Sequence, residues 1–197
     1  MSTTPIRRLG VAVVAIAATS AAVLLPSATS TVHATAFCDA VALNPSAIFV
    51  TGFHQGTAAN EIFIGSSDPD DIRGGGGNDV LCGRGARDQL LGGPGNDRIE
   101  GEEGNDIMDG EADRDVLVGG VGSDEMRGGN GNDELNGNDG NDLLEGGTGN
   151  DQLNGNDHDD QLFGQAGDDA HDGGPGNDVC TDTSSALDTF TASCFFP

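Results

Sequence analysis

The sequence lacks Trp, Tyr and Lys, and its eight Arg face 33 Asp and Glu, which gives a formal net charge of −25 at pH 7. This balance makes nucleic acids and anionic membrane surfaces poor partners, because both attract Lys and Arg. Large apolar side chains are too few to fill a sizeable conventional core. The 33 Gly in 197 residues are more than twice the usual share of about 7%. Two classes remain: a disordered acidic chain, or a protein whose carboxylates are neutralised by bound cations.

The first 36 residues contain no Asp or Glu. A basic start at Arg7 and Arg8 precedes an apolar run over 11–25, and small residues follow up to Ala36. The run is shorter than the ~20 residues that a spanning helix needs. The pattern predicts a secretory signal peptide over 1–36, cleaved after Ala36, and hence a secreted, extracellular chain with no membrane span after cleavage. The adjacent arginines leave twin-arginine export open beside the general secretory route.

From Gly56 to Thr181 the chain divides into fourteen units of nine residues without an insertion. Position 1 is Gly in all fourteen, position 4 is Gly in nine, and position 6 is Asp in thirteen, with Glu61 in the first. Position 8 is Phe, Ile, Leu or Met in the first twelve units, followed by His171 and Cys180. Low-complexity disorder does not keep such a register, so the acids have a geometric role.

This pattern, G-G-x-G-x-D-x-U-x, resembles the calcium-binding nonapeptide of RTX, or haemolysin-type, proteins. Residues 74–82, 92–100 and 146–154 match it at every fixed position. The chain is also similar to small secreted bacterial calcium-binding proteins built of these repeats. The resemblance implies an all-β fold, a parallel β-roll (β-solenoid), in which six residues turn, three form a strand and two repeats make a coil. The N-terminal signal and the cysteines depart from the classical RTX toxins and proteases.

Position 8 is the only consistently apolar position, so alternation along a short strand places it inside and positions 7 and 9 outside. About seven coils then stack two thin columns of inward side chains. The columns are Phe63, Leu81, Ile99, Leu117, Leu135, Leu153, His171 and Ile72, Leu90, Met108, Met126, Leu144, Leu162, Cys180.

Glycines in the turns let backbone carbonyls point at a cation, and the Asp carboxylates add hard oxygen ligands of the kind that calcium prefers. The resemblance implies that each Ca²⁺ lies between turns 18 residues apart and shares two Asp. The best pairs are Asp79/Asp97, Asp106/Asp124, Asp124/Asp142 and Asp133/Asp151. The candidate metal ligands are Asp70, Asp79, Asp88, Asp97, Asp106, Asp115, Asp124, Asp133, Asp142, Asp151, Asp160, Asp169 and Asp178.

Four turns are weaker candidates, because Asp68, Ala86, Asp113 and His158 replace the position-4 Gly that permits the turn. Without calcium, the stacked carboxylates repel one another and the thin core does not offset the chain entropy. Calcium binding and folding are therefore expected to be one event.

The segments 37–55 and 182–197 flank the repeats and are predicted to cap the two ends of the roll, as a solenoid requires. An even number of cysteines in an exported chain indicates disulfides, and four cysteines allow three connectivities. Pairing of Cys38 with Cys82 and of Cys180 with Cys194 would attach each cap to its own end of the roll.

The sequence contains no HExxH, G-x-S-x-G or Walker motif, and the EF-hand spacing fails. We therefore expect no enzyme activity. The predicted function is that of a secreted protein that folds on binding several Ca²⁺ and acts as a structural or interaction module. The alternative is an accessory or targeting module of a secreted hydrolase or toxin. Apart from calcium ions, the sequence indicates no particular partner.

Overall fold

A computed structural model describes residues 35–42, 44–181, 188–191 and 194–195. The predicted signal peptide lies outside the described residues except for Thr35 and Ala36, which begin the helix α1 (Thr35–Val41). No helix in this described part of the chain is long and apolar enough to span a membrane.

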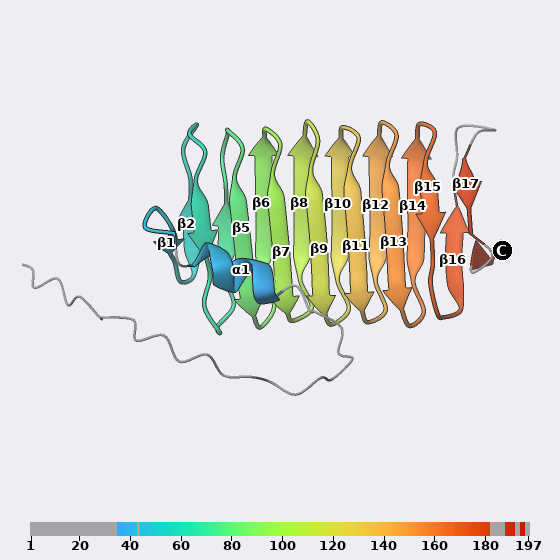
Figure 1. The fold of residues 1–197 in the computed structure, drawn as a ribbon, viewed down its shortest axis with the longest axis horizontal. Helices are drawn as coiled ribbons and strands as arrows, with labels where there is room; N and C mark the ends of the chain where they lie inside the picture. The colour runs from blue at the N-terminus through green and yellow to red at the C-terminus, as the bar shows by residue number, and fades with distance from the viewer. Residues whose placement is uncertain (1–34, 43, 182–187, 192–193, 196–197) are drawn as a thin grey trace, which may run out of the picture. The chain divides into compact units, whose positions relative to one another are not determined.

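The repeats and the segments that flank them form two nine-stranded sheets in which all neighbouring strands are parallel. Odd-numbered strands make one sheet, here the odd sheet, and even-numbered strands make the other, the even sheet (Figure 1). The odd sheet contains β1 (Ile48–Phe49), β3 (Ile62–Ile64), β5 (Val80–Gly85), β7 (Arg98–Glu103), β9 (Val116–Val121), β11 (Glu134–Asp139), β13 (Gln152–Asp157), β15 (Ala170–Asp172) and β17 (Thr189–Phe190). The even sheet contains β2 (Phe53–Gln55), β4 (Asp71–Arg73), β6 (Gln89–Pro94), β8 (Ile107–Ala112), β10 (Glu125–Asn130), β12 (Leu143–Thr148), β14 (Gln161–Ala166), β16 (Asp178–Thr181) and β18 (Cys194–Phe195).

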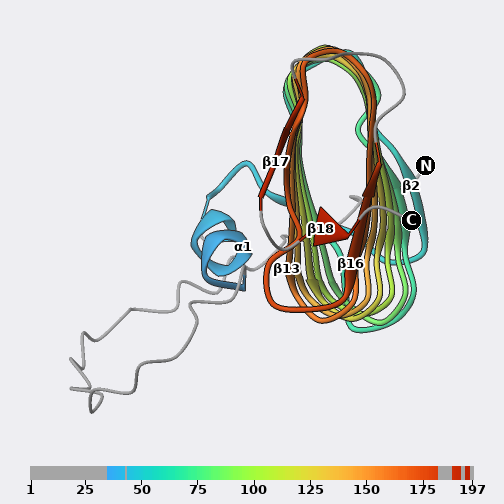
Figure 2. The same cartoon turned by 90° about the vertical axis from the view of Figure 1, so that its right-hand side faces the viewer.

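The two sheets face each other across a thin core (Figure 2). Each position-8 residue lies beside its equivalents 18 residues away, as Leu135 does between Leu117 and Leu153. The position-8 side chains from Phe63 to Cys180 are buried, with exposures of 0–2%. The predicted parallel β-roll with two repeats per coil and inward position-8 columns is therefore confirmed.

Each sheet has nine strands rather than the seven that fourteen repeats supply, because the flanking segments extend the roll. At the N-terminal end, β1 pairs with β3 and β2 pairs with β4. At the C-terminal end, β17 pairs with β15 and β18 pairs with β16. These end strands continue the hydrogen-bonded stacking, and the ring of Phe190 stacks on that of His171 with centroids 4.8 Å apart.

The strands in the middle of the roll are longer than the three residues expected. From β5 to β14 each strand has six residues and continues into positions 1–3 of the next repeat. Cys82 pairs with Glu100 and Arg84 pairs with Glu102, so only the intervening position-1 Gly drops out of the pairing. The expectation of six-residue turns was wrong, because backbone hydrogen bonding between coils does not depend on the apolar pattern. Positions 4–6 form the turn itself.

Both predicted disulfides are present, Cys38–Cys82 and Cys180–Cys194. The first attaches α1 to the outer side of the odd sheet, where Cys38, Ile64 and Cys82 form a second small core against Phe37 and Val41. The second joins Cys180 of β16 to Cys194 of β18, and both residues belong to the main core. Each bridge therefore holds one end of the roll.

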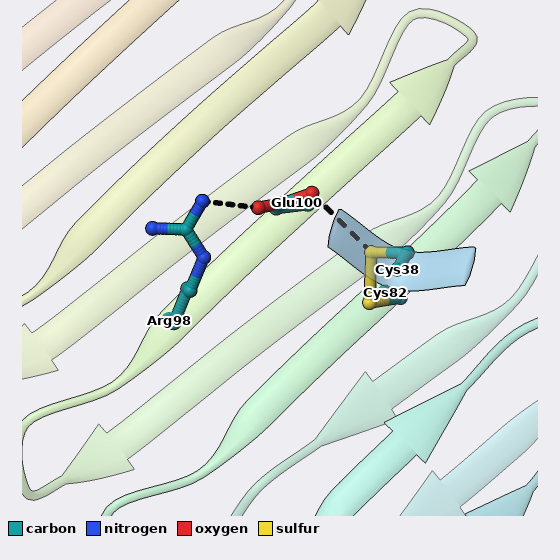
Figure 3. The surroundings of a disulfide bond; sticks show 4 residues. All are labelled: Cys38, Cys82, Arg98 and Glu100. Atoms are coloured by element: carbon teal, nitrogen blue, oxygen red, sulfur yellow. Dashed lines mark hydrogen bonds and ion pairs between the residues drawn. A yellow bond between two sulfur atoms is a disulfide. The ribbon is translucent and has the colours of Figure 1, made fainter. Parts of the chain in front are cut away.

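Glu100 lies beside the first disulfide and is fully buried, although its position 9 predicts an outward side chain (Figure 3). Its Oε2 is 3.4 Å from Sγ of Cys38, and Arg98 forms an ion pair with its other oxygen. The Arg98 guanidinium also lies 4.2 Å from the ring centroid of Phe37. Burial raises the pKa of Glu100, and the charge of Arg98 opposes that rise. The side chain does point away from the main core, and α1 covers it.

Candidate metal centres

The thirteen position-6 aspartates form two columns of buried carboxylates, one along each edge of the roll. Each directly precedes or begins a strand, where the turn returns the chain into a sheet. None of the thirteen is more than 4% exposed. Charged carboxylates are almost never buried to this extent unless a partner compensates them.

Successive aspartates of a column are joined by a backbone hydrogen bond. Asp106 N–H donates to Oδ1 of Asp124 at 2.8 Å, and Asp124 N–H donates to Oδ1 of Asp142 at 2.8 Å. The same contact, with distances of 2.7–3.0 Å, recurs at every step from Asp70 to Asp178. The structure therefore brings together each predicted Asp pair 18 residues apart.

The second carboxylate oxygen is the feature that indicates a cation. Among the described residues, ten of these aspartates have a buried Oδ2 that accepts no hydrogen bond. A buried carboxylate oxygen without a donor is costly unless a charge compensates it. The ten are Asp79, Asp88, Asp97, Asp106, Asp115, Asp124, Asp133, Asp142, Asp160 and Asp178.

The position-1 glycines make room for this oxygen. A Cβ on Gly119 would overlap Oδ2 of Asp124, and a Cβ on Gly128 would overlap Oδ2 of Asp133. Any side chain at this position would therefore displace the carboxylate, which explains why Gly occupies it in all fourteen repeats.

The protein alone stabilises these carboxylates poorly in their charged form. Burial raises the pKa of Asp124 to about 7, and the neighbouring Asp106 carboxylate adds to the rise. Burial is also the largest cause for Asp115, whose pKa is about 8. Elsewhere the pKa rises to about 7 for Asp88 and Asp142 and to about 6 for Asp97, Asp106 and Asp160. A divalent cation beside the columns would reverse this effect, because opposite charge favours the ionised form.

Of the four turns predicted to be weaker candidates, three keep the glycine-like conformation. Ala86, Asp113 and His158 have φ of 75°, 74° and 87°, in the left-handed region that usually needs Gly. Asp68 does not take a positive φ. The expectation of weaker turns therefore applies, in geometric terms, only to the turn at Asp68.

Sequence reasoning missed a second ladder at position 5. Asn78 N–H donates to Oδ1 of Asn60 at 2.9 Å, and Asn96 N–H donates to Oδ1 of Asn78 at 3.1 Å. The same contact recurs on both edges, where it lines up successive turns. The signal was present, since Asn occupies position 5 in eight of the fourteen repeats.

The cysteines belong to the framework rather than to the metal centres. The two sulfurs of Cys38 and Cys82 and a carboxylate oxygen of Glu102 lie within 4.8 Å of one another. The sulfurs are bonded to each other, so no thiolate is available as a ligand.

Comparison with known proteins gives one family. The model for the RTX calcium-binding nonapeptide repeat matches six overlapping segments, which together cover residues 55–180. No curated protein matches the chain at a significant level.

Proposed function

Since the chain belongs to the RTX calcium-binding nonapeptide repeat family, we propose that it is a secreted protein that folds on binding several Ca²⁺ and then serves as a structural or interaction module. Membership of the family supports calcium as the ligand. The number of ions, the coupling to folding and the export of the chain are parts of the proposal.

The observation that carries the proposal is the set of buried Asp oxygens that accept no hydrogen bond. Calcium takes six to eight oxygen ligands, from carboxylates and backbone carbonyls, and both kinds lie at the turns. Pairs such as Asp106/Asp124 and Asp133/Asp151 would hold ions between successive turns. Thiols and imidazoles do not recur in the columns, which disfavours zinc and copper.

Calcium would act as a folding ligand because the columns are unfavourable without it. At Asp88, Asp115 and Asp142 the ionised carboxylate is raised in energy by burial and by two or more neighbouring carboxylates. The core offers only one apolar side chain per repeat to offset this cost. A site that exists only in the folded chain converts binding free energy into folding free energy.

The test is a calcium titration of the chain beginning at Phe37, followed by calorimetry and by far-ultraviolet circular dichroism. We expect several ions per chain and a parallel gain of β structure, with a midpoint on the order of 10⁻⁴–10⁻³ M as for other extracellular modules. Magnesium serves as the control ion, because its octahedral geometry and tightly held waters suit these turns poorly. An unchanged β spectrum in chelator would contradict the coupling of binding to folding.

The proposal assigns no catalytic activity to the chain. Hydrolysis of protein, lipid or glycan substrates by the purified, calcium-loaded protein would contradict this and favour an accessory role in a secreted hydrolase. Export is tested separately by N-terminal sequencing of the released protein, which is expected to begin at Phe37.

A further inference from the structure

The exposed apolar side chains of the roll gather at its N-terminal end. In the described part of the chain four large apolar side chains are exposed, and three of them lie on the first two strands: Ile48 and Phe49 on β1, and Phe53 on β2 (Figure 1). Phe49 and Phe53 are the most exposed, at 61% and 64%. Arg84 lies 5.8 Å from the ring centroid of Phe49, and Arg73 lies 5.2 Å from that of Phe53. Apolar side chains that gather in one place, rather than singly, indicate a contact surface.

The same two strands are the open edges of both sheets. β1 pairs with β3 and β2 pairs with β4, and among the described residues no strand pairs with their other side. Natural proteins usually protect such an edge with charged side chains or Pro. Neither β1 nor β2 contains Pro, Asp, Glu, Arg or Lys. This end of the roll is therefore open to pairing with a further strand.

The N-terminal end also carries little charge, although the chain as a whole is strongly acidic. Residues 40–60 contain no Asp, Glu, Arg or Lys, whereas the formal net charge of the chain is −25. On the neighbouring strand β4, Arg73 forms an ion pair with Asp71. A high net charge keeps copies of a protein apart, so two copies of this chain approach each other most easily at this end.

The C-terminal end of the roll does not share these properties. β17 and β18 also end the two sheets, but Asp172 ends β15 and Asp188 directly precedes β17. No Arg or Lys follows residue 127 in the sequence to offset these acids. Two C-terminal ends would repel each other, and a head-to-tail contact would place the apolar edge against an acidic one.

We propose that the N-terminal end of the roll, formed by β1 and β2, binds the same end of a second copy of the chain. The two sheets face each other (Figure 2), so a second copy turned about a two-fold axis perpendicular to the roll offers two open edges at the same separation. Both edges then pair at once, whereas an extended peptide would pair with only one. The inference goes beyond the proposed function, because it requires only a folded roll.

The symmetry of the contact determines the size of the assembly. A contact that uses the same surface on both partners is closed, and it gives a dimer rather than a filament. The surface is small, since β1 has two residues and β2 has three. It belongs to the smallest class of interfaces, so we expect dimers only at protein concentrations on the order of 10⁻⁴ M.

The test is sedimentation equilibrium of the processed, calcium-loaded protein over a range of concentrations. The mean mass is expected to rise toward that of two copies and no further. Added salt is expected to strengthen the dimer, because it screens the net charge and leaves the apolar contact in place. Salt would weaken a head-to-tail contact held by opposite charges, so dissociation in salt would overturn the inference.

Substitutions at the two rings test the surface itself. Phe49→Lys and Phe53→Lys each place like charges on both sides of the contact and are expected to weaken dimerisation roughly tenfold. Both rings are more than half exposed, so circular dichroism and calcium binding are expected to stay unchanged. The matched control is Val121→Lys, which adds the same charge at an exposed apolar residue of β9, away from the end. It is expected to dimerise as the parent chain does.

A complementary pair of variants decides which ends meet. Phe53→Lys and Phe53→Glu are each expected to be monomeric alone and to associate when mixed in equal amounts, because opposite charges then face each other across the two-fold axis. Failure of the mixture to associate, masses beyond two copies, or dimers that survive both lysine variants would overturn the inference. A calcium-loaded chain that stays monomeric at every concentration would also overturn it, while the proposed function would stand. A chain that binds no calcium would contradict the proposed function instead.

Discussion

Replacing Asp124 by Asn tests the aspartate columns with the smallest change of shape. Oδ1 of Asp124 accepts the Asp106 N–H, and an Asn carbonyl can retain this hydrogen bond. The carboxylate charge and the buried Oδ2 are lost. Because the charge costs free energy without calcium and provides a ligand with it, the substitution is expected to have opposite effects under the two conditions.

The size of the first effect follows from the pKa of Asp124. Burial raises this pKa from 3.8 to about 7, and at 1.36 kcal/mol for each pKa unit the ionised form costs the folded state at most about 4 kcal/mol at pH 8. Relaxation of the turn reduces this value, so we expect Asp124→Asn to stabilise the calcium-free roll by about 1–4 kcal/mol. With calcium, the variant loses an anionic ligand between Asp106 and Asp142 and binds more weakly.

The assay has two arms. In chelator at pH 8, circular dichroism follows folding as trimethylamine N-oxide is added, since this osmolyte favours the compact state; the variant is expected to fold at a lower concentration. In the second arm, calorimetry measures calcium stoichiometry and affinity, and at least one of the two is expected to fall clearly. The matched control is Glu125→Gln, which removes the same charge from the exposed neighbouring residue.

The comparison of Asp124→Asn with Glu125→Gln decides whether calcium binding depends on the position of the acid within the repeat or only on the overall density of negative charge. The reasoning requires that Glu125→Gln be nearly silent in both arms. If the two variants weaken calcium binding equally, the assignment of position 6 as the ligand is wrong. If Asp124→Asn destabilises the calcium-free roll, the buried carboxylate is compensated by something other than calcium.

Three other perturbations test other parts of the structure. In chelator, β structure is expected to increase as the pH falls from 8 to 5. The reason is that a raised pKa, such as that of Asp115 at about 8, makes the folded state most stable below the unfolded pKa of about 4 and less stable as the pH rises through 8. A loss of circular dichroism signal on acidification would contradict this. Leu135 is fully buried, so Leu135→Ala is expected to lower the denaturant-derived stability of the calcium-loaded roll by about 2–5 kcal/mol, whereas Glu134→Ala changes it by about 0.5 kcal/mol or less. Gly122 has φ of 140°, and a Cβ added there would overlap the Gly104 carbonyl, so Gly122→Ala is expected to disrupt the stacking of adjacent coils. Ala86→Gly removes the strain of a positive φ at Ala86 and is expected to raise the melting temperature, through a gain in folding stability of about 1 kcal/mol.

The columns of inward apolar side chains and the aspartate columns could be predicted from the sequence because the same pattern recurs in successive repeats. An apolar residue at position 8 and an Asp at position 6 recur with one phase, so their stacking follows from the period alone. Both disulfides could be predicted as well, since each cysteine pair lies near one end of the repeats and the roll keeps the ends apart.

The features that escaped prediction are those held by the backbone or by single contacts. Positions 1–3 carry no apolar signal, so the long strands depend on backbone pairing such as that of Arg84 with Glu102. The end strands lie outside the repeat and have no pattern to reveal them. Glu100 occupies an outward position, and only the docking of α1 through Cys38 makes it a buried residue.

The stacking of coils at both ends under disulfides has a mechanical consequence. Each coil of 18 residues adds one strand spacing, about 4.8 Å, to the roll and can be drawn out to about 60 Å. The bridges Cys38–Cys82 and Cys180–Cys194 exclude the terminal loops from this extension, so a pulling force must peel coils from the stretch between Cys82 and Cys180. The molecule is thus extensible between two fixed ends, and under the proposed coupling of binding to folding, calcium would set the force at which its middle coils open.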